Sequence, residues 1–183
     1  MFGAFKSTPL NDAAEAGNLD AVKRALARGA DVNERGMLKT TPLMNAAAKG
    51  HAHVVRFLLT VEGIDINTLN AGGTNALMTA CRQGHMDVVR ALLDDPRTDV
   101  NSLGRYGGTA LMNAAGFGHR DIVEELLKVE GISLAATYTE KKHSPITIAR
   151  QNGFEDIARL LEDFETARQS AKPAAKAPKP PRP

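Results

Sequence analysis

Residues 41–51 have the sequence TPLMNAAAKGH, and four other segments of the chain repeat this pattern in altered form. They are TPLNDAAEAGN at 8–18, NALMTACRQGH at 75–85, TALMNAAGFGH at 109–119 and SPITIARQNGF at 144–154. The aliphatic residues that mark the copies are separated by 33, 34, 34 and 35 positions: Leu10, Leu43, Leu77, Leu111 and Ile146. A nearly constant period of this length predicts a fold built from stacked repeats.

Each copy predicts two helices separated by a glycine. In residues 74–101, TNALMTACRQGHMDVVRALLDDPRTDVN, apolar residues at helical spacing precede Gly84, and a second apolar stripe follows at 88–89 and 92–93. Gly84 fits the left-handed position that ends a helix, where a Cβ costs energy. Thr-Pro at 8–9 and 41–42 and Ser-Pro at 144–145 predict an N-cap followed by proline. Because one unit cannot bury its apolar faces alone, we expect five units to share one core.

The composition suits closely stacked helices. Hydrophobic residues make up 43% of the 183 residues, but aromatics are only 4% and tryptophan is absent, so small aliphatic side chains must do the packing. The single cysteine, Cys81, excludes an intrachain disulfide and indicates a reducing compartment. Neither a signal-peptide run nor an apolar stretch of ~18 residues is present. We therefore expect a soluble, cytoplasmic monomer without a membrane-spanning segment.

The charge is distributed unevenly along the chain. The net charge is +2, yet residues 166–183 contain five basic residues and no acid, which leaves the rest of the chain with 18 basic and 21 acidic residues. The same segment holds five of the nine prolines. Proline-rich, charged sequence cannot form a helix or bury a core. We therefore predict a folded domain at 1–165 and a basic, disordered tail rich in alanine, lysine and proline at 166–183.

The repeated units resemble ankyrin repeats. They share the Thr-Pro-Leu opening, the Ala-Ala pair, Gly-His, the Asp-(Ile/Val)-Val-Xaa-Xaa-Leu-Leu core and the Asp-Val-Asn ending at 31–33 and 99–101. The resemblance covers residues 7–164, as five repeats at about 7–35, 36–69, 70–103, 104–138 and 139–165. It implies an all-α ankyrin-repeat solenoid of stacked helix-turn-helix units with hairpin-like turns. It also implies a protein that binds other proteins and is not an enzyme.

Two features depart from the family pattern. The histidine that usually follows Thr-Pro-Leu is replaced by Asn11, Met44, Met78, Met112 and Thr147. The last turn, SLAATYTEKKH at 133–143, lacks both the Asp-Val-Asn ending and a turn glycine. The hairpin form of that turn is therefore in doubt. We interpret the methionines as packing residues between repeats.

The residues that could carry chemistry favour a structural interpretation. His51, His85 and His119 occupy one repeat position, so neighbours should lie roughly 8–10 Å apart, whereas the ligands of one zinc lie about 2 Å from it. We interpret them as hydrogen-bonding groups between adjacent loops. Recurring acids begin the second helices and suit the helix dipole: Asp20, Asp87, Asp121 and Asp156. Cys81 replaces an alanine, which predicts a buried thiol. We predict no metal, no cofactor and no catalytic group.

The resemblance also implies where a partner binds. In ankyrin repeats the partner surface is concave and consists of the turn tips and the ends of the first helices. Carried over to this sequence, the partner-binding residues are Met37, Leu38, Lys39, Lys49, Arg82, Gln83, Arg105, Tyr106, Phe117, Tyr138, Lys141 and His143. This set contains both tyrosines and is basic, and aromatic residues with arginine are typical of binding hot spots. The alternative is that these are solvated loop residues without a partner.

Three functions are compatible with the sequence. The first is a module that binds another protein with an acidic or mixed surface on its concave face. The second is a bacterial effector that is delivered through its basic C-terminal tail. The third is weak nucleic-acid association by the tail, where five spaced charges would give only a salt-sensitive, non-specific contact.

Overall fold

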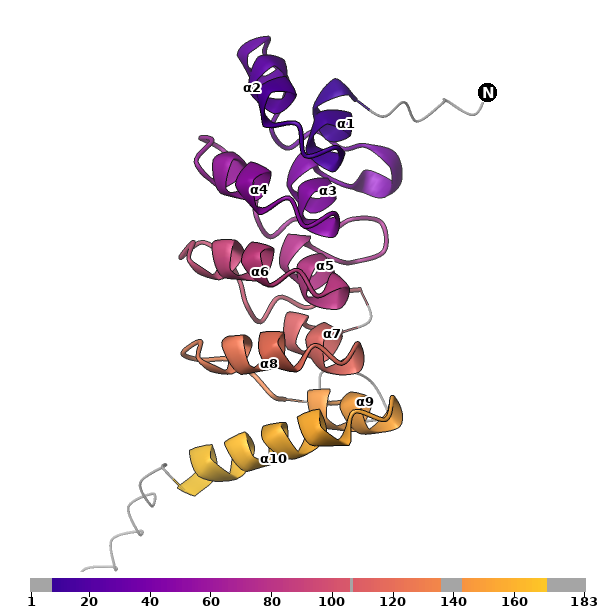
Figure 1. Cartoon of the computed structure of the whole chain (residues 1–183), viewed down its shortest axis with the longest axis vertical. Helices are drawn as coiled ribbons and strands as arrows, with labels where there is room; N and C mark the ends of the chain where they lie inside the picture. The colour runs from indigo at the N-terminus through magenta and orange to yellow at the C-terminus, as the bar shows by residue number, and fades with distance from the viewer. Residues whose placement is uncertain (1–7, 106, 136–142, 171–183) are drawn as a thin grey trace, which may run out of the picture.

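The computed structural model describes residues 8–105, 107–135 and 143–170, which form helices and connecting turns but no β-strand. The α-helices are α1 (Pro9–Glu15), α2 (Leu19–Ala27), α3 (Pro42–Ala48), α4 (Ala52–Leu59), α5 (Ala76–Gln83), α6 (Met86–Leu93), α7 (Ala110–Gly116), α8 (Arg120–Leu127), α9 (Pro145–Gln151) and α10 (Glu155–Ser170). A short 3-10 helix, η1, covers Met37–Lys39. The α-helices form five pairs that stack in chain order, with odd-numbered helices in one row and even-numbered helices in the other (Figure 1). The predicted all-α solenoid is confirmed.

The helix boundaries follow from capping residues. The side chain at each first-helix N-cap accepts a hydrogen bond from the backbone N–H three residues later; these caps are Thr8, Thr41, Asn75, Thr109 and Ser144. A glycine in the left-handed region follows each first helix, with φ from +69° to +84°: Gly17, Gly50, Gly84, Gly118 and Gly153. Because a Cβ is strongly disfavoured at such φ values, glycine sets the tight turn into the second helix.

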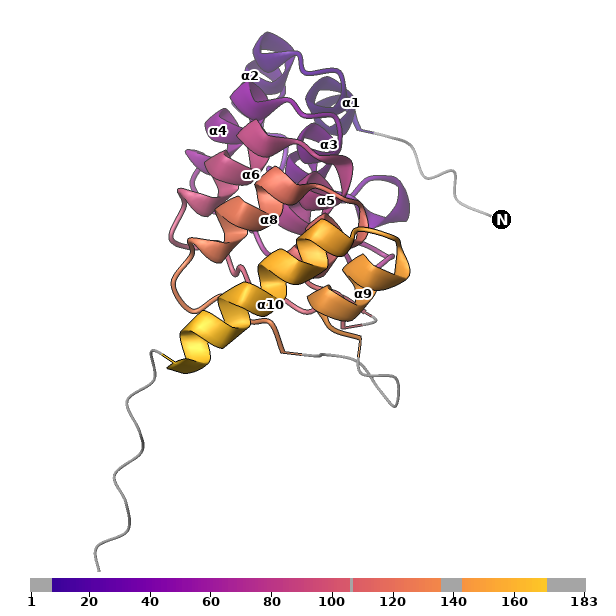
Figure 2. The same ribbon diagram turned by 60° about the horizontal axis from the view of Figure 1, so that its bottom comes forward.

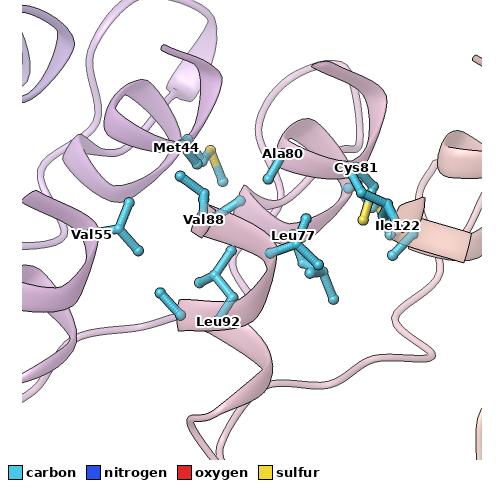
Figure 3. Close-up of a cluster of buried hydrophobic side chains, with 14 of the residues drawn as sticks. Met44, Val55, Leu77, Ala80, Cys81, Val88, Leu92 and Ile122 are labelled. Carbon is cyan, nitrogen blue, oxygen red and sulfur yellow. The ribbon is translucent and has the colours of Figure 1, made fainter. Parts of the chain in front are cut away.

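The core lies between the two rows of helices and consists mainly of alanine, leucine, isoleucine and valine. Cys81 is fully buried at the position that Ala14, Ala47 and Ala115 hold in three other copies, and Figure 3 shows it beside Ile122. Burial raises the pKa of the Cys81 thiol, so the group stays neutral and unreactive. Met44, Met78 and Met112 are also buried, which confirms their predicted packing role.

The last helix is longer than the sequence analysis predicted. Helix α10 continues to Ser170, so the expected boundary after residue 165 falls inside a helix. Phe164 packs against the core, and Arg168 Nη1 donates to Ile132 O at 2.7 Å, which ties this part of α10 to the stack. Figure 2 shows α10 crossing the end of the stack and extending past α8. The disorder predicted for the rest of the tail concerns residues 171–183, outside the described part of the chain.

Histidine side chains join successive helix pairs at the glycine turns. The ring Nε2–H of His51, His85 and His119 donates to a backbone carbonyl of the preceding pair, at 3.0, 3.1 and 3.0 Å. The acceptors are Glu15 O, Ala48 O and Arg82 O. This confirms the interpretation of the histidines as hydrogen-bonding groups, and it fixes the spacing of the helix pairs that carry the candidate site.

A second series of hydrogen bonds joins the opposite loops. Asn67 Nδ2 donates to Arg97 O at 2.8 Å, and Asn67 Oδ1 accepts from Asp99 N at 2.9 Å. Asn33 makes the same pair of bonds one helix pair earlier. Asn101 makes it one helix pair later. Each asparagine of the Asp-Val-Asn ending, which is Asp-Ile-Asn at 65–67, therefore clamps the next loop, a role that the sequence analysis did not assign.

Candidate functional site

Three short turns connect the helix pairs, and we call them the first finger (36–40), the second finger (70–74) and the third finger (104–108, described without residue 106). A backbone hydrogen bond closes each turn, from the N–H of its first residue to the carbonyl of its last, at 2.8, 3.0 and 2.9 Å. Neighbouring fingers also bond to each other, from Ala71 N to Leu38 O at 2.7 Å and from Arg105 N to Gly73 O at 3.3 Å. The fingers therefore form one continuous edge, with the hairpin-like turns that the sequence predicted.

The first finger exposes apolar side chains to solvent. Met37 is 59% exposed and Leu38 is 69% exposed, the highest values among the large hydrophobic residues of the described chain. The backbone of Leu38 and Lys39 lies in the left-handed region, with φ of 55° and 59°. In Figure 1 this finger is the purple loop beside α3, on the side away from the even-numbered helices.

The ends of the first helices form a second edge, which we call the helix-end row: Glu15, Lys49, Arg82, Gln83 and Phe117. Phe117 is 56% exposed, although it is one of only six phenylalanines in the chain. Lys49 Nζ lies 3.1 Å from Glu15 Oε1, so this predicted partner-binding cation already has a partner within the chain. Arg82 and Phe117 hold the same two repeat positions as Glu15 and Lys49, two helix pairs later. Arg82 and Phe117 are therefore at neighbouring positions of the helix-end row.

The predicted site residues divide between these two edges. Met37, Leu38, Lys39 and Arg105 belong to the fingers, and Lys49, Arg82, Gln83 and Phe117 belong to the helix-end row. His143 is half-buried directly before the N-cap of α9, at the repeat position that Thr40, Thr74 and Gly108 hold in the fingers. Tyr106, Tyr138 and Lys141 lie outside the described residues. The two edges flank the odd-numbered helices, which are seven or eight residues, or about 10–12 Å, long.

Comparison with known proteins agrees with this architecture. A family model described as "Ankyrin repeats (3 copies)" matches residues 10–103 and, in a second match, residues 96–170.

The chain belongs to the ankyrin-repeat family. Ankyrin repeats are generally protein-interaction modules, and the family is typically non-enzymatic. A stretch of 58 residues is 48% identical to the "Probable E3 ubiquitin-protein ligase XBOS33" of Oryza sativa subsp. japonica. That match covers 32% of this chain and 11% of the rice protein, so the chain resembles only a small part of this relative.

Ion pairs join the later even-numbered helices of the ankyrin stack, although Arg24 and Arg56 of that row are exposed and make no ion pair with a described residue. Between even-numbered helices, Arg90 lies 3.5 Å from Glu125 and Arg120 lies 3.1 Å from Asp156. The hydrogen bond from Arg120 lowers the pKa of Asp156, and the hydrogen bond from Lys128 lowers that of Glu125. On the finger and helix-end side, four exposed cations make no ion pair with any described residue: Arg35, Lys39, Arg82 and Arg105. This side therefore offers positive charge to a partner.

The left-handed backbone of the first finger was not anticipated from the sequence, but a signal for it exists. Lys39 stands 34 positions before Gly73, which stands 34 positions before Gly107. Both glycines have positive φ values, 74° and 70°. A lysine at a position where the next two copies have glycine predicts a costly backbone conformation.

Two other kinds of site are absent from the described ranges. These residues contain no group of three or more histidine, cysteine, aspartate or glutamate side chains that could hold a metal ion. Among them, no helix combines the length and apolarity that a membrane crossing requires.

Proposed function

We propose that this ankyrin-repeat chain is a non-enzymatic module that binds another protein on its concave face, through the fingers and the helix-end row. The observation that carries the proposal is the exposure of Met37, Leu38 and Phe117, each more than half accessible to solvent. Large apolar side chains left exposed at both edges of the odd-numbered row favour burial against a partner. Nothing in their position requires them for the core.

The uncompensated cations indicate the chemistry of the partner. Arg82 and the exposed Phe117 occupy neighbouring positions of the helix-end row, and Arg35 and Lys39 flank the apolar residues of the first finger in the sequence. A partner that presents apolar side chains among carboxylates would match both edges, because complementary charge steers association and fixes orientation. The proposed partner surface is therefore acidic or mixed.

The ligase activity in the name of the rice relative is not part of this proposal. The match spans 11% of that protein. An activity of the whole relative cannot be assigned to a segment of that size, whereas binding of another protein agrees with the family as a whole.

The test is to capture a partner with the full chain, purify it, and measure its affinity calorimetrically for three variants. Phe117→Ala should weaken binding by at least about tenfold, because truncating a hot-spot anchor has effects of this size or larger. Arg82→Glu should weaken it further at low salt, since it reverses a charge at the interface. The thermal midpoints should stay near that of the wild type, because both side chains are exposed.

Arg56→Glu is the matched control for the charge reversal. Arg56 is exposed on α4, in the even-numbered row. If Arg56→Glu abolished binding while Phe117→Ala and Arg82→Glu had no effect, the partner would bind the opposite side and the proposal would be wrong.

A further inference from the structure

The first finger adopts a conformation that disfavours its own residues. Leu38 and Lys39 are consecutive and both left-handed, a combination that costs energy for residues with a Cβ. The second and third fingers form the same closed turn with Gly73 and Gly107 at the position of Lys39. A glycine at 39 would therefore relieve the strain at that residue, although Leu38 would remain left-handed.

A dense set of hydrogen bonds holds the strained turn. Lys39 N donates to Gly36 O at 3.1 Å, and Thr40 donates to Met37 O through both its backbone N–H, at 3.1 Å, and its Oγ1, at 2.9 Å. Leu38 O accepts from Ala71 N of the second finger. The backbone carbonyl of Leu38 is thus tied to the neighbouring finger while its side chain is exposed. Strain of this kind persists where the surroundings fix it, and it concentrates at functional positions.

The left-handed backbone and the exposed apolar side chains of the first finger both lower the stability of the fold. A solvated turn would be more stable with glycine or asparagine in the left-handed positions and with polar side chains at the tip. Met37 and Leu38 instead form a small apolar knob that is rigidly presented. Arg35 and Lys39, exposed and without an ion pair among the described residues, stand on either side of it.

We propose that this knob is the main anchor of the binding face, and that it docks on an acidic amphipathic helix of the partner. The apolar stripe of such a helix offers holes between side chains that accept a knob, and its flanking carboxylates face Arg35 and Lys39. This inference rests on the proposed function, since it names the kind of partner that the same face receives.

The first experiment uses a synthetic peptide as the probe. A labelled peptide of ~18 residues carries leucine at helical spacing and glutamate elsewhere, and its binding to the full chain is followed by fluorescence anisotropy. One matched peptide has lysine in place of glutamate, and another has serine in place of leucine. The acidic amphipathic peptide should bind at least about tenfold more tightly than either. Equal binding of the three peptides, or no binding, would overturn the inference.

The second experiment separates anchoring from structure with variants of the first finger. Leu38→Asn tolerates the left-handed backbone but removes the apolar side chain, so peptide affinity should fall at least about tenfold while the thermal midpoint stays equal or rises. Lys39→Gly relieves strain and keeps Met37 and Leu38, so the midpoint should rise and affinity should fall only a few-fold, by roughly the effect of one exposed charge. Leu103→Asn is the matched control, because Leu103 is another leucine that is about half exposed, at 53%.

The outcomes distinguish this inference from the proposed function. If Leu38→Asn binds the peptide as tightly as Leu103→Asn does, the knob is not the anchor and the inference is wrong. The proposed function is judged separately, on the natural partner with Phe117→Ala and Arg82→Glu. Loss of partner binding in those variants, with full binding by Leu38→Asn, would keep the binding face and reject the knob.

Discussion

The two ends of the first helix in each pair differ in how far their contacts repeat along the stack. At the glycine turns, the same contact recurs: a Cβ placed on Gly17, Gly50 or Gly84 would meet the ring of His51, His85 or His119 from the next helix pair. At the fingers, the backbone closure recurs but the side chains do not, and one finger is strained where the others have glycine. The repeated contact builds the stack, whereas the finger side chains and the helix-end residues beside the glycines, such as Arg82 and Phe117, vary between copies and are free to meet a partner.

The fourth glycine turn shows that the repeated end keeps its contacts even when its residues change. There the histidine is replaced by Phe154, whose ring lies over Gly118. Phe154 cannot donate the hydrogen bond, and Asn152 Nδ2 donates to Gly116 O at 2.7 Å instead. Substitution at this end is compensated by a neighbouring residue, while substitution at the first finger leaves strain and exposed apolar area.

The largest effect should come from filling a glycine turn. A Cβ on Gly84 would lie 2.6 Å from His119 Cε1, at a residue whose φ is +77°. We expect Gly84→Ala to lower the free energy of unfolding by about 3 kcal/mol, from left-handed strain plus overpacking. Urea denaturation monitored by circular dichroism measures this loss.

Gly153→Ala is the matched control for Gly84→Ala. Gly153 has a similar φ, +84°, but a Cβ there would meet no atom within 4 Å. The control should therefore lose only the strain contribution, about 1 kcal/mol. If the two variants lost equal stability, the histidine contact would not be what makes the repeated end rigid.

A smaller loss should follow from removing one asparagine clamp. Asn67→Ala removes the bonds to Arg97 O and from Asp99 N, which should cost about 1–2 kcal/mol in urea denaturation. Asn67→Asp keeps an acceptor for Asp99 N but cannot donate to Arg97 O, so its loss should be intermediate. An Asn67→Ala variant as stable as the wild type would show that the asparagines mark the family without stabilising this stack.

The helix pairs could be predicted from the sequence, but the contacts that join them could not. The period, the capping residues and the left-handed glycines are local signals, so the helix pairs and their order could be predicted. The asparagine clamp joins residues about 30 positions apart, and the pairing of Lys49 with Glu15 joins neighbouring helices. Such contacts depend on the register between helix pairs, which the local pattern does not specify. The end of α10 was misplaced for a similar reason, because Arg168 is held by Ile132 O of another pair.

The strained first finger allows a test in which a substitution should raise the stability of the fold. Lys39→Gly should stabilise the fold by about 0.5 kcal/mol, because relief of left-handed strain exceeds the added chain entropy of glycine in the unfolded state. Denaturant midpoints of the variant and the wild type measure the gain. The same substitution at a fully relaxed position would destabilise, so a lower midpoint for Lys39→Gly would show that the finger is not strained.

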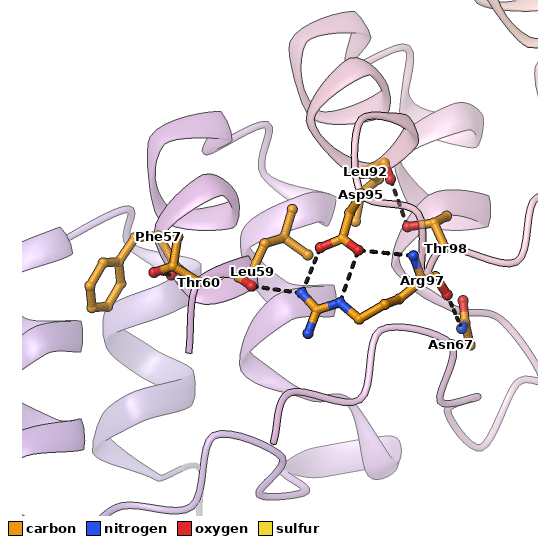
Figure 4. Close-up of polar contacts among 8 residues, drawn as sticks. All are labelled: Phe57, Leu59, Thr60, Asn67, Leu92, Asp95, Arg97 and Thr98. Carbon is orange, nitrogen blue, oxygen red and sulfur yellow. Dashed lines mark hydrogen bonds and ion pairs between the residues drawn. The ribbon is translucent and has the colours of Figure 1, made fainter. Parts of the chain in front are cut away.

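The smallest predicted effect concerns the one loop that departs from the repeated pattern on the opposite edge. At the position of Gly63 and Gly131, the third helix pair has Arg97, whose Nη2 donates to Asp95 Oδ2 at 2.6 Å and to Leu59 O at 2.8 Å (Figure 4). The hydrogen bond from Arg97 lowers the pKa of Asp95. The folded chain therefore keeps this carboxylate charged at a pH where the unfolded chain binds a proton.

The sign of the pH dependence follows from that lowered pKa. The stabilisation is fully present above the unfolded pKa of Asp95, about 4, and is lost as the pH falls below it towards the folded pKa. We expect Asp95→Asn to be slightly less stable than the wild type at pH 7, and the difference to shrink below about pH 4. Because the Arg97 side chain is 51% exposed, solvent screens the pair and added salt should reduce the difference further. Thermal denaturation from pH 7 to pH 3, with Asp94→Asn as the neighbouring control, measures this. A difference that stays constant across the pH range would mean that Arg97 holds the loop through Leu59 O alone, without help from the Asp95 charge.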